Sequence, residues 1–168
     1  SSDDDNTPPP PPPPPDPDPA AQRGDLIGQP QLTGTYTPNE LLAIAATDDV
    51  TQLLLEEILS PDCGIDVYRI DYQTVDPAGN LTPASGALMV PDDSATQCQG
   101  ARPIVLYAHG TNTDITFNMS DLESSNNTES LLMAAMFASE GYIVVAPNYV
   151  GYDSSTLAYH PYLNGDQQ

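Results

Sequence analysis

Two short apolar runs in the second half of the chain, 104–108 (IVLYA) and 142–147 (YIVVAP), have no polar interruption. A continuous apolar run bounded by turn residues is typical of a strand buried on both faces. Between them, 126–129 (NNTE) is a helix start signal, and 129–140 carries apolar residues at helical spacing and ends at Gly141. Two such strands joined by a helix predict a βαβ unit, and therefore a parallel pair of strands.

The pattern before these runs predicts two helices and a hairpin. The segment 37–40 (TPNE) is a capping box with proline at the first helical position, so it predicts a helix that starts there. The segment 47–49 (TDD) predicts a second helix, which Pro61 ends. The segments 65–75 and 81–91 are rich in residues that favour strands and are joined by the turn sequence DPAGN, which predicts a β-hairpin.

The first nineteen residues differ in composition from the rest. They are acidic and polar, and Pro8 to Pro15 form an unbroken proline run, which favours an extended polyproline II conformation. We therefore expect 1–19 to be a disordered acidic and polyproline linker and 20–168 to be one domain. Such starts resemble the linkers of bacterial lipoproteins, which follow a lipidated cysteine. This resemblance implies a mature chain that is secreted or is a periplasmic or outer-membrane lipoprotein anchored through a cysteine before Ser1. The alternative is a disordered N-terminal segment that does not direct the protein to any compartment.

Charge and cysteine content narrow the class further. The chain has 24 acidic and 3 basic residues and a formal charge of -21, which argues against binding nucleic acid or an anionic membrane surface electrostatically. The two cysteines, Cys63 and Cys98, flank the predicted hairpin, so they predict either a disulfide, in keeping with export, or two separate buried thiols. No histidine or cysteine spacing completes a tetrahedral metal site, and we expect no metal.

Three motifs at these spacings resemble a known family: YAHGT at 107–111, EGYIVVAPNYVGYDSS at 140–155 and HPYLNG at 160–165. Over 37–168 the chain resembles the N-terminal half of an α/β-hydrolase, and more narrowly the secretory lipases and prolyl-oligopeptidase-like esterases. The resemblance implies an incomplete α/β-hydrolase fold: the N-terminal strands of a mostly parallel sheet, with an N-terminal β-hairpin and flanking helices. The second apolar strand would lie between the hairpin and the first, leaving 104–108 at the sheet edge.

The same resemblance implies where the chemistry lies. The His-Gly loop of the family sits beside the oxyanion hole, so the backbone N–H of Gly110 or Thr111 is expected to stabilise the negative charge of an acyl intermediate. His109 precedes any nucleophile in chain order, so we expect it to hydrogen-bond the loop rather than act as a base. Ser154 and Ser155 are expected to shape their turn. The polar segment 112–127 is long for a connection and is predicted to be functional or lid-like.

No Gly-x-Ser-x-Gly motif occurs in the chain. The resemblance places the nucleophile, the acid and the catalytic histidine beyond the position that matches residue 168. We therefore expect the N-terminal part of a secreted or lipid-anchored serine hydrolase of carboxylic esters, inactive alone and needing no cofactor. Its expected partners are an ester or lipid substrate and the remainder of the hydrolase. The alternatives are part of a prolyl-oligopeptidase-type peptidase, a non-catalytic binding module derived from a hydrolase, and a surface spacer lipoprotein with an accidental likeness.

Overall fold

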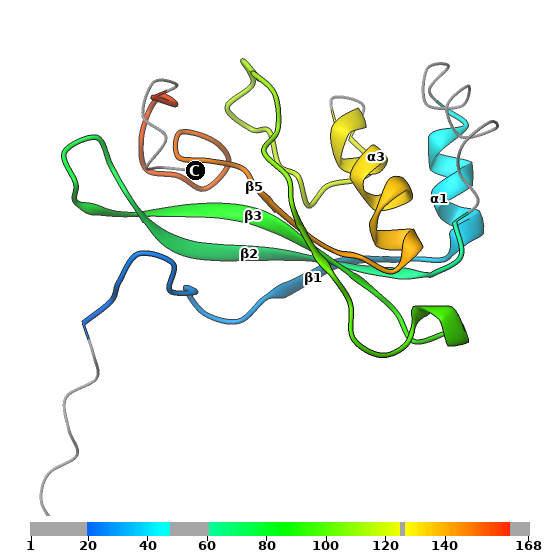
Figure 1. Ribbon diagram of the computed structural model, residues 1–168. Coiled ribbons are helices and arrows are strands. Elements are labelled where there is room, and N and C mark those ends of the chain that lie inside the picture. The colour runs from blue at the N-terminus through cyan, green and yellow to red at the C-terminus, as the bar shows by residue number, and fades with distance from the viewer. Residues whose placement is uncertain (1–19, 48–60, 125–126, 162–168) are drawn as a thin grey trace, which may run out of the picture.

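The computed structural model describes residues 20–47, 61–124 and 127–161. Its helices and strands are β1 (Gln31–Tyr36), α1 (Pro38–Ala45), β2 (Ile65–Val75), β3 (Leu81–Pro91), β4 (Ile104–Leu106), α3 (Thr128–Met136) and β5 (Ile143–Pro147), with 3₁₀ turns at Thr96–Cys98 and Ala138–Glu140 (Figure 1). The linker 1–19 and most of the helix expected after Thr47 lie outside the described residues. No helix in the described ranges is long and apolar enough to cross a membrane.

The strands form one sheet in the order β1-β2-β3-β5-β4. Strand β4 pairs with β5 in parallel, with Val105 opposite Val144, so the predicted βαβ unit is confirmed. Strand β5 lies between the hairpin and β4, as expected. The expectation of a mostly parallel sheet is wrong for the described strands, because the other three pairings are antiparallel. A parallel pair needs a crossover connection, and α3 provides the one crossover between neighbouring strands here.

Strand β1 was not predicted. Its sequence, QLTGTY, is mostly polar, and its pairing with β2 is irregular between Leu32 and Gly34. The ring of Tyr36 lies over Gly34, where an added Cβ would come within 2.6 Å of it. The strand therefore depends on the edge offered by β2 rather than on its own apolar pattern.

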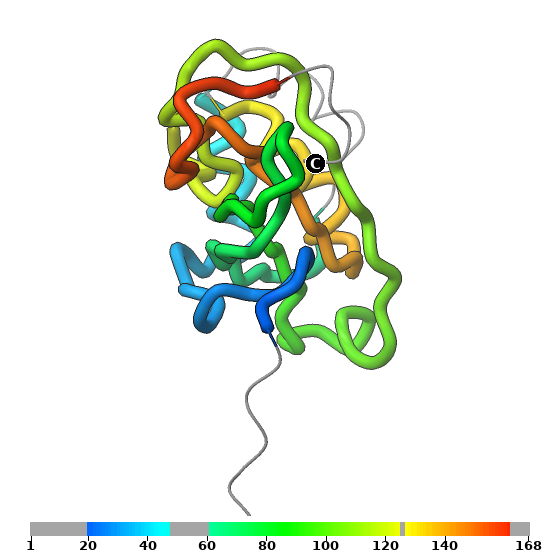
Figure 2. The backbone as a smooth tube through the Cα atoms, turned by 90° about the vertical axis from the view of Figure 1, so that its left-hand side faces the viewer, coloured from blue at the N-terminus to red at the C-terminus, as the bar shows by residue number. Residues whose placement is uncertain are grey.

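The two helices cover one face of the sheet. In both views α1 and α3 lie on one side, and residues 20–30 (blue) lie on the other (Figures 1 and 2). On the helical face Val67, Met89 and Val144 stand opposite one another across three strands and are fully buried. They pack with Leu41 of α1 and Leu131 of α3 in the main core.

The other face of the sheet is largely open. Leu88, Val145 and Leu106 form the matching row on it, and Leu106 is 72% exposed. Ile104, also on β4, is 68% exposed. The prediction that this strand is buried on both faces is therefore wrong in the described structure. Its outer edge is unpaired, and no described helix covers the face where these side chains lie.

The helix ends follow the sequence signals in part. Thr37 and Glu40 form the predicted capping box, with Glu40 N–H donating to Thr37 Oγ1 at 3.2 Å and Thr37 N–H donating to Glu40 Oε2 at 2.8 Å. Asn127 stands at the N-terminus of α3, but its side chain caps nothing there. Its amide instead donates to the carbonyl oxygens of Asn118 and Asp121, at 2.5 and 2.7 Å. The side chain of Asn127 therefore holds the preceding loop instead of capping the helix.

Helix α3 is shorter than the predicted 129–140. It ends at Met136, and Phe137 breaks it before the 3₁₀ turn that closes the segment. Gly141 follows with φ of 95°, so its predicted left-handed conformation is confirmed. A glycine is favoured there because it lacks the Cβ that penalises positive φ.

The predicted disulfide between Cys63 and Cys98 is present, with an S–S distance of 2.06 Å. Both cysteines are buried. The bond ties the segment before β2 to the 3₁₀ turn that precedes β4, so it anchors the connection between the hairpin and the βαβ unit.

Candidate functional site

The candidate site lies where β4 and β5 end side by side. The loop 108–112 follows β4 and contains His109 and Gly110, and the loop 148–155 follows β5. In open α/β sheets the carboxyl ends of parallel strands are the usual place for ligands. Tyr149 and Asp153 in the second loop have positive φ, 70° and 50°. Non-glycine residues with such backbone angles store strain and cluster at functional sites.

His109 holds the two loops together. Its Nδ1 lies 2.7 Å from the Gly110 carbonyl oxygen and its Nε2 lies 3.1 Å from the Asn148 carbonyl oxygen. The ring is buried and stacks on Tyr149, with centroids 4.1 Å apart. Carbonyl oxygens only accept hydrogen bonds and a neutral imidazole carries one N–H, so each neutral tautomer of His109 donates to one of these two carbonyls. This geometry agrees with the expected loop-bonding role and leaves neither ring nitrogen facing an attacking serine.

An aromatic cluster completes the link between the loops. Tyr149 lies between two histidine rings, with His160 stacked at a centroid distance of 5.2 Å. The Tyr149 hydroxyl donates to the His109 carbonyl oxygen at 3.1 Å, and the Tyr152 hydroxyl donates to the Asn112 carbonyl oxygen at 2.5 Å. Rings and hydroxyls from the second loop thus fix the backbone of the first.

Asn148 is the buried polar centre below these loops, with no exposed surface. Its Oδ1 accepts from the Met119 N–H at 2.7 Å, and its Nδ2 donates to Ser85 Oγ at 2.9 Å and to Asn118 Oδ1 at 3.2 Å. Its backbone carbonyl is the one that contacts His109. The Asn148 side chain therefore connects β3 and the 112–124 loop to the end of β5. Buried polar groups are nearly always hydrogen-bonded, and both polar atoms of this side chain have partners.

The two serines of the second loop serve its turn. Ser154 Oγ donates to Asp71 at 3.1 Å, and Ser155 Oγ accepts from the Leu157 N–H at 3.3 Å. Asp153 accepts from Ser85 Oγ at 2.6 Å and pairs with Arg69 at 2.8 Å. These bonds fasten the loop to β2 and β3, in agreement with the expectation that Ser154 and Ser155 shape the turn.

The two residues expected to supply the oxyanion N–H differ in their surroundings. The Gly110 N–H donates to Glu129 Oε2 at 3.1 Å. The exposed Thr111 donates no backbone or hydroxyl hydrogen bond to any residue within the described ranges. Both residues lie at the carboxyl end of β4, where the resemblance placed them.

Glu129, in the first turn of α3, was not anticipated. The oxygen that accepts from Gly110 also accepts from the Tyr107 hydroxyl at 2.7 Å. Burial, followed by the hydrogen bond to Glu129, raises the pKa of Tyr107 to about 12, so this hydroxyl stays a donor at neutral pH. The only sequence signal for this residue was its position at a predicted helix start. Acidic residues are common there because they interact favourably with the helix dipole, so the signal did not point to a role in the loop.

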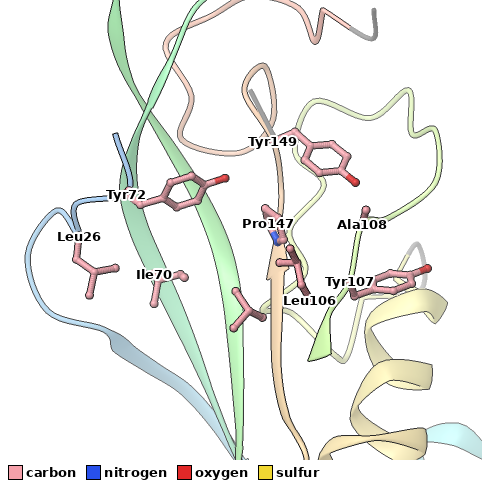
Figure 3. A pocket seen from close by; sticks show the side chains of 10 residues that line it. Leu26, Ile70, Tyr72, Leu106, Tyr107, Ala108, Pro147 and Tyr149 are labelled. Atoms are coloured by element: carbon pink, nitrogen blue, oxygen red, sulfur yellow. The ribbon is translucent and has the colours of Figure 1, made fainter. Parts of the chain in front are cut away.

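An apolar groove opens beside the His-Gly loop on the face of the sheet away from the helices (Figure 3). It has a volume of about 330 Å³. Its floor and walls are formed by Gly24, Leu26, Ile70, Tyr72, Leu106, Tyr107, Ala108, Val145, Pro147 and Tyr149. The Tyr72 hydroxyl is buried and has no hydrogen-bond partner among the described residues, and burial raises its pKa to about 12.

The long segment between β4 and α3 is packed rather than open, as far as it is described. Phe117, Met119 and Leu122 are buried in the main core. Asp114 accepts from the N–H and the hydroxyl of Thr116, which closes a tight turn. The described part of 112–124 is therefore anchored in the core by these residues, and it also contacts Asn148 through Asn118 and Met119. Within the described ranges, no group of three or more histidine, cysteine or acidic side chains forms a metal site.

Comparison with known proteins identifies a class. No family model matches the chain, and no curated protein matches it. Among solved structures, it is similar to the rice cell wall degrading esterase LipA from Xanthomonas oryzae, with 27% identity over 86% of this chain and a TM-score of 0.65. It is similar to a ligand-bound form of LipA with 27% identity over 84% of this chain and a TM-score of 0.66. It is also similar to a candidate hydrolase from Legionella pneumophila, with 25% identity over 85% of this chain and a TM-score of 0.66.

The chain therefore has a hydrolase-like fold, and this similarity supports a hydrolase-type function. More particularly, the LipA structures to which it is similar are those of an esterase. The chain spans about a third of the length of these proteins, covering 33% of LipA in both forms and 35% of the Legionella protein.

Proposed function

We propose that this chain is the N-terminal part of a serine hydrolase of carboxylic esters, and that the nucleophile, the acid and the catalytic histidine come from further polypeptide. The observation that carries the proposal is the geometry at β4. This strand ends the described sheet with one edge unpaired, and the loop at its carboxyl end presents the backbone N–H of Thr111, which donates to no described residue. In LipA, of which this chain matches a third, esterase activity is associated with a much longer chain.

The chemistry follows from the position of the loop. A serine that attacks an ester carbonyl makes a tetrahedral intermediate with negative charge on oxygen, and a histidine carries the proton to the leaving alcohol. Backbone N–H groups at a rigid strand end stabilise this charge without rearranging. The buried His109, the aromatic cluster and Asn148 supply the rigidity, because they hold the loop through both side-chain and backbone contacts.

The groove and the edge support a second part of the proposal, that further polypeptide packs here. An exposed apolar strand edge is a template for pairing with another strand, and proteins rarely leave one uncovered. The groove is lined almost entirely by apolar atoms and contains the unpartnered Tyr72 hydroxyl. A covering segment would pair with β4, bury Leu106 and supply an acceptor for that hydroxyl.

The test compares the 168-residue chain with a longer polypeptide that carries it. The chain alone is expected to leave a p-nitrophenyl ester unhydrolysed and to resist labelling by a fluorophosphonate. The longer protein is expected to hydrolyse the ester and to be labelled at a serine outside residues 1–168. Labelling of Ser154 or Ser155 in the chain alone would overturn the proposal, and so would a longer protein that is folded but never labelled.

Substrate choice is tested in the same protein. We propose that it prefers an ester to a proline-containing peptide. Hydrolysis of the peptide with the ester left intact would favour the prolyl-oligopeptidase type instead. A folded chain that binds ester without any turnover, in either length, would favour a non-catalytic binding module.

We also propose that the protein is exported, either secreted or anchored through a lipidated cysteine before Ser1. The disulfide between Cys63 and Cys98 supports an oxidising compartment, because such bonds are rare in reducing cytosol. Fractionation of the producing cells with a lipid-labelling reagent would test both forms. Recovery of the protein in the cytosol with both thiols free would refute export.

A further inference from the structure

We propose that Glu129 is the positioning residue of the His-Gly loop, and that by holding the Gly110 N–H it leaves the Thr111 N–H as the oxyanion donor. This inference rests on the proposed function and assigns a residue role within it. The first observation is the shared acceptor: a single oxygen of Glu129 receives the Gly110 N–H at 3.1 Å and the Tyr107 hydroxyl at 2.7 Å. The carboxylate thus fixes the loop on both sides of His109.

The second observation concerns why residue 110 is a glycine. Gly110 is not among the glycines with positive φ, so its backbone angles do not require glycine. A Cβ built on Gly110 would instead lie 3.2 Å from Glu129 Oε1, a tight contact that would require the carboxylate to shift by a few tenths of an ångström. The missing side chain therefore makes room for the carboxylate.

The third step separates the two candidate donors. A backbone N–H has one hydrogen, so Gly110 cannot donate well to an oxyanion while it donates to Glu129. A carboxylate on that N–H would also repel the developing negative charge. Thr111 follows directly, is exposed, and donates no hydrogen bond to a residue in the described part of the chain. Its N–H can therefore donate a hydrogen bond to the oxyanion, while the contact between Gly110 and Glu129 holds the backbone in place.

The role of Glu129 in positioning the loop can be tested in the 168-residue chain, because the measurement needs no catalytic activity. Gly110 is the one glycine that follows a histidine, so labelling with ¹³C′-histidine and ¹⁵N-glycine selects its amide. The expected result is exchange of the Gly110 amide about tenfold faster in Glu129→Ala than in the wild type. Glu129→Gln is expected to stay near the wild type, because its side-chain oxygen still accepts. Glu140→Gln, an exposed acid away from the loop, is the matched control. Equal exchange in all four proteins would overturn the positioning role.

The catalytic half is tested in the hydrolase that contains both this chain and the nucleophile. Replacing the backbone amide of residue 111 by an ester removes its N–H and weakens the Gly110 carbonyl as an acceptor for His109. This replacement is expected to lower kcat by about 10²–10³-fold with little change in KM. The same replacement at residue 110 is expected to lower kcat less than at 111. Glu129→Ala is expected to lower kcat by up to about 10²-fold, with rescue by Glu129→Gln.

The outcomes distinguish the inference from the proposed function. A larger loss of kcat from the replacement at 110 than at 111 would overturn the assignment to Thr111 while leaving the hydrolase intact. Absence of hydrolysis in a folded protein with its nucleophile present would overturn the proposed function, and the Thr111 role with it. In that case the amide exchange of Gly110 would still report whether Glu129 positions the loop.

Discussion

Removal of the Asn148 side chain is expected to destabilise the chain more than any single change at its surface. In Asn148→Ala the Met119 N–H loses its acceptor at a fully buried position. A stranded buried donor costs about 1–3 kcal/mol. The hydrogen bonds to Ser85 and Asn118 are lost as well, each worth about 0.5–1 kcal/mol, although both partners keep another contact. The expected loss in the free energy of unfolding is therefore about 3 kcal/mol.

The assay is urea unfolding at neutral pH, followed by far-ultraviolet circular dichroism under non-reducing conditions. Thr35→Ala is the matched control, because it deletes one exposed hydrogen bond, to Asp66 at 2.8 Å, and should cost about 0.5 kcal/mol or less. Asn148→Asp keeps the acceptor for Met119 but buries a charge and removes the donor to Ser85, so it should be at least as harmful as alanine. The reasoning is refuted if Asn148→Ala loses no more free energy than Thr35→Ala.

Three further changes test the disulfide, the sheet edge and the groove. Replacing Cys63 and Cys98 by serine should lower the free energy of unfolding by about 4 kcal/mol, since the bond closes a loop with a sequence separation of 35; a urea midpoint equal to that of the oxidised wild type would contradict this. Replacing Ile104 and Leu106 by lysine should reduce self-association of the isolated chain, measured by light scattering across a concentration series, because the charged edge no longer favours strand pairing; unchanged association would show that this edge is not the contact. In Tyr72→Phe the free energy of unfolding at neutral pH should be unchanged or slightly higher, because a buried hydroxyl without a partner is removed. The pKa of Tyr72 is about 12 in the fold against 10 in the unfolded chain, so the unfolded chain releases this proton first and the free energy of unfolding falls between pH 10 and 12; the variant should lose less stability there, and an identical alkaline profile would contradict the assignment.

Much of the local structure could be predicted from the sequence, because it depends on neighbours in the chain. The capping box of Thr37 and Glu40, the hairpin β2–β3 and the left-handed Gly141 all use contacts within a few residues or a regular pairing set by a short turn. The βαβ unit was also predictable, since a helix between two apolar runs leaves few other arrangements.

The tertiary structure decided what each pattern is used for. Asn127 has the sequence of a helix cap, but its Nδ2 group donates to two carbonyl oxygens of the preceding loop, and its Oδ1 accepts no hydrogen bond from the described residues. Strand β1 forms because β2 offers it an edge. The apolar residues of β4 predicted burial on two faces, yet burial depends on what lies beside and above the strand.

The candidate site divides in the same way. The sequence by itself determined that a His-Gly loop ends one strand and an Asn-Tyr loop ends its neighbour, because order along the chain sets which residues follow each strand. Only the tertiary structure decided that Glu129 occupies the Gly110 N–H, that Asn148 joins three segments and that His109 is fully engaged. These contacts join residues 19 to 39 positions apart. Hydrogen bonds at such separations depend on how the strands and loops pack, which no local pattern encodes.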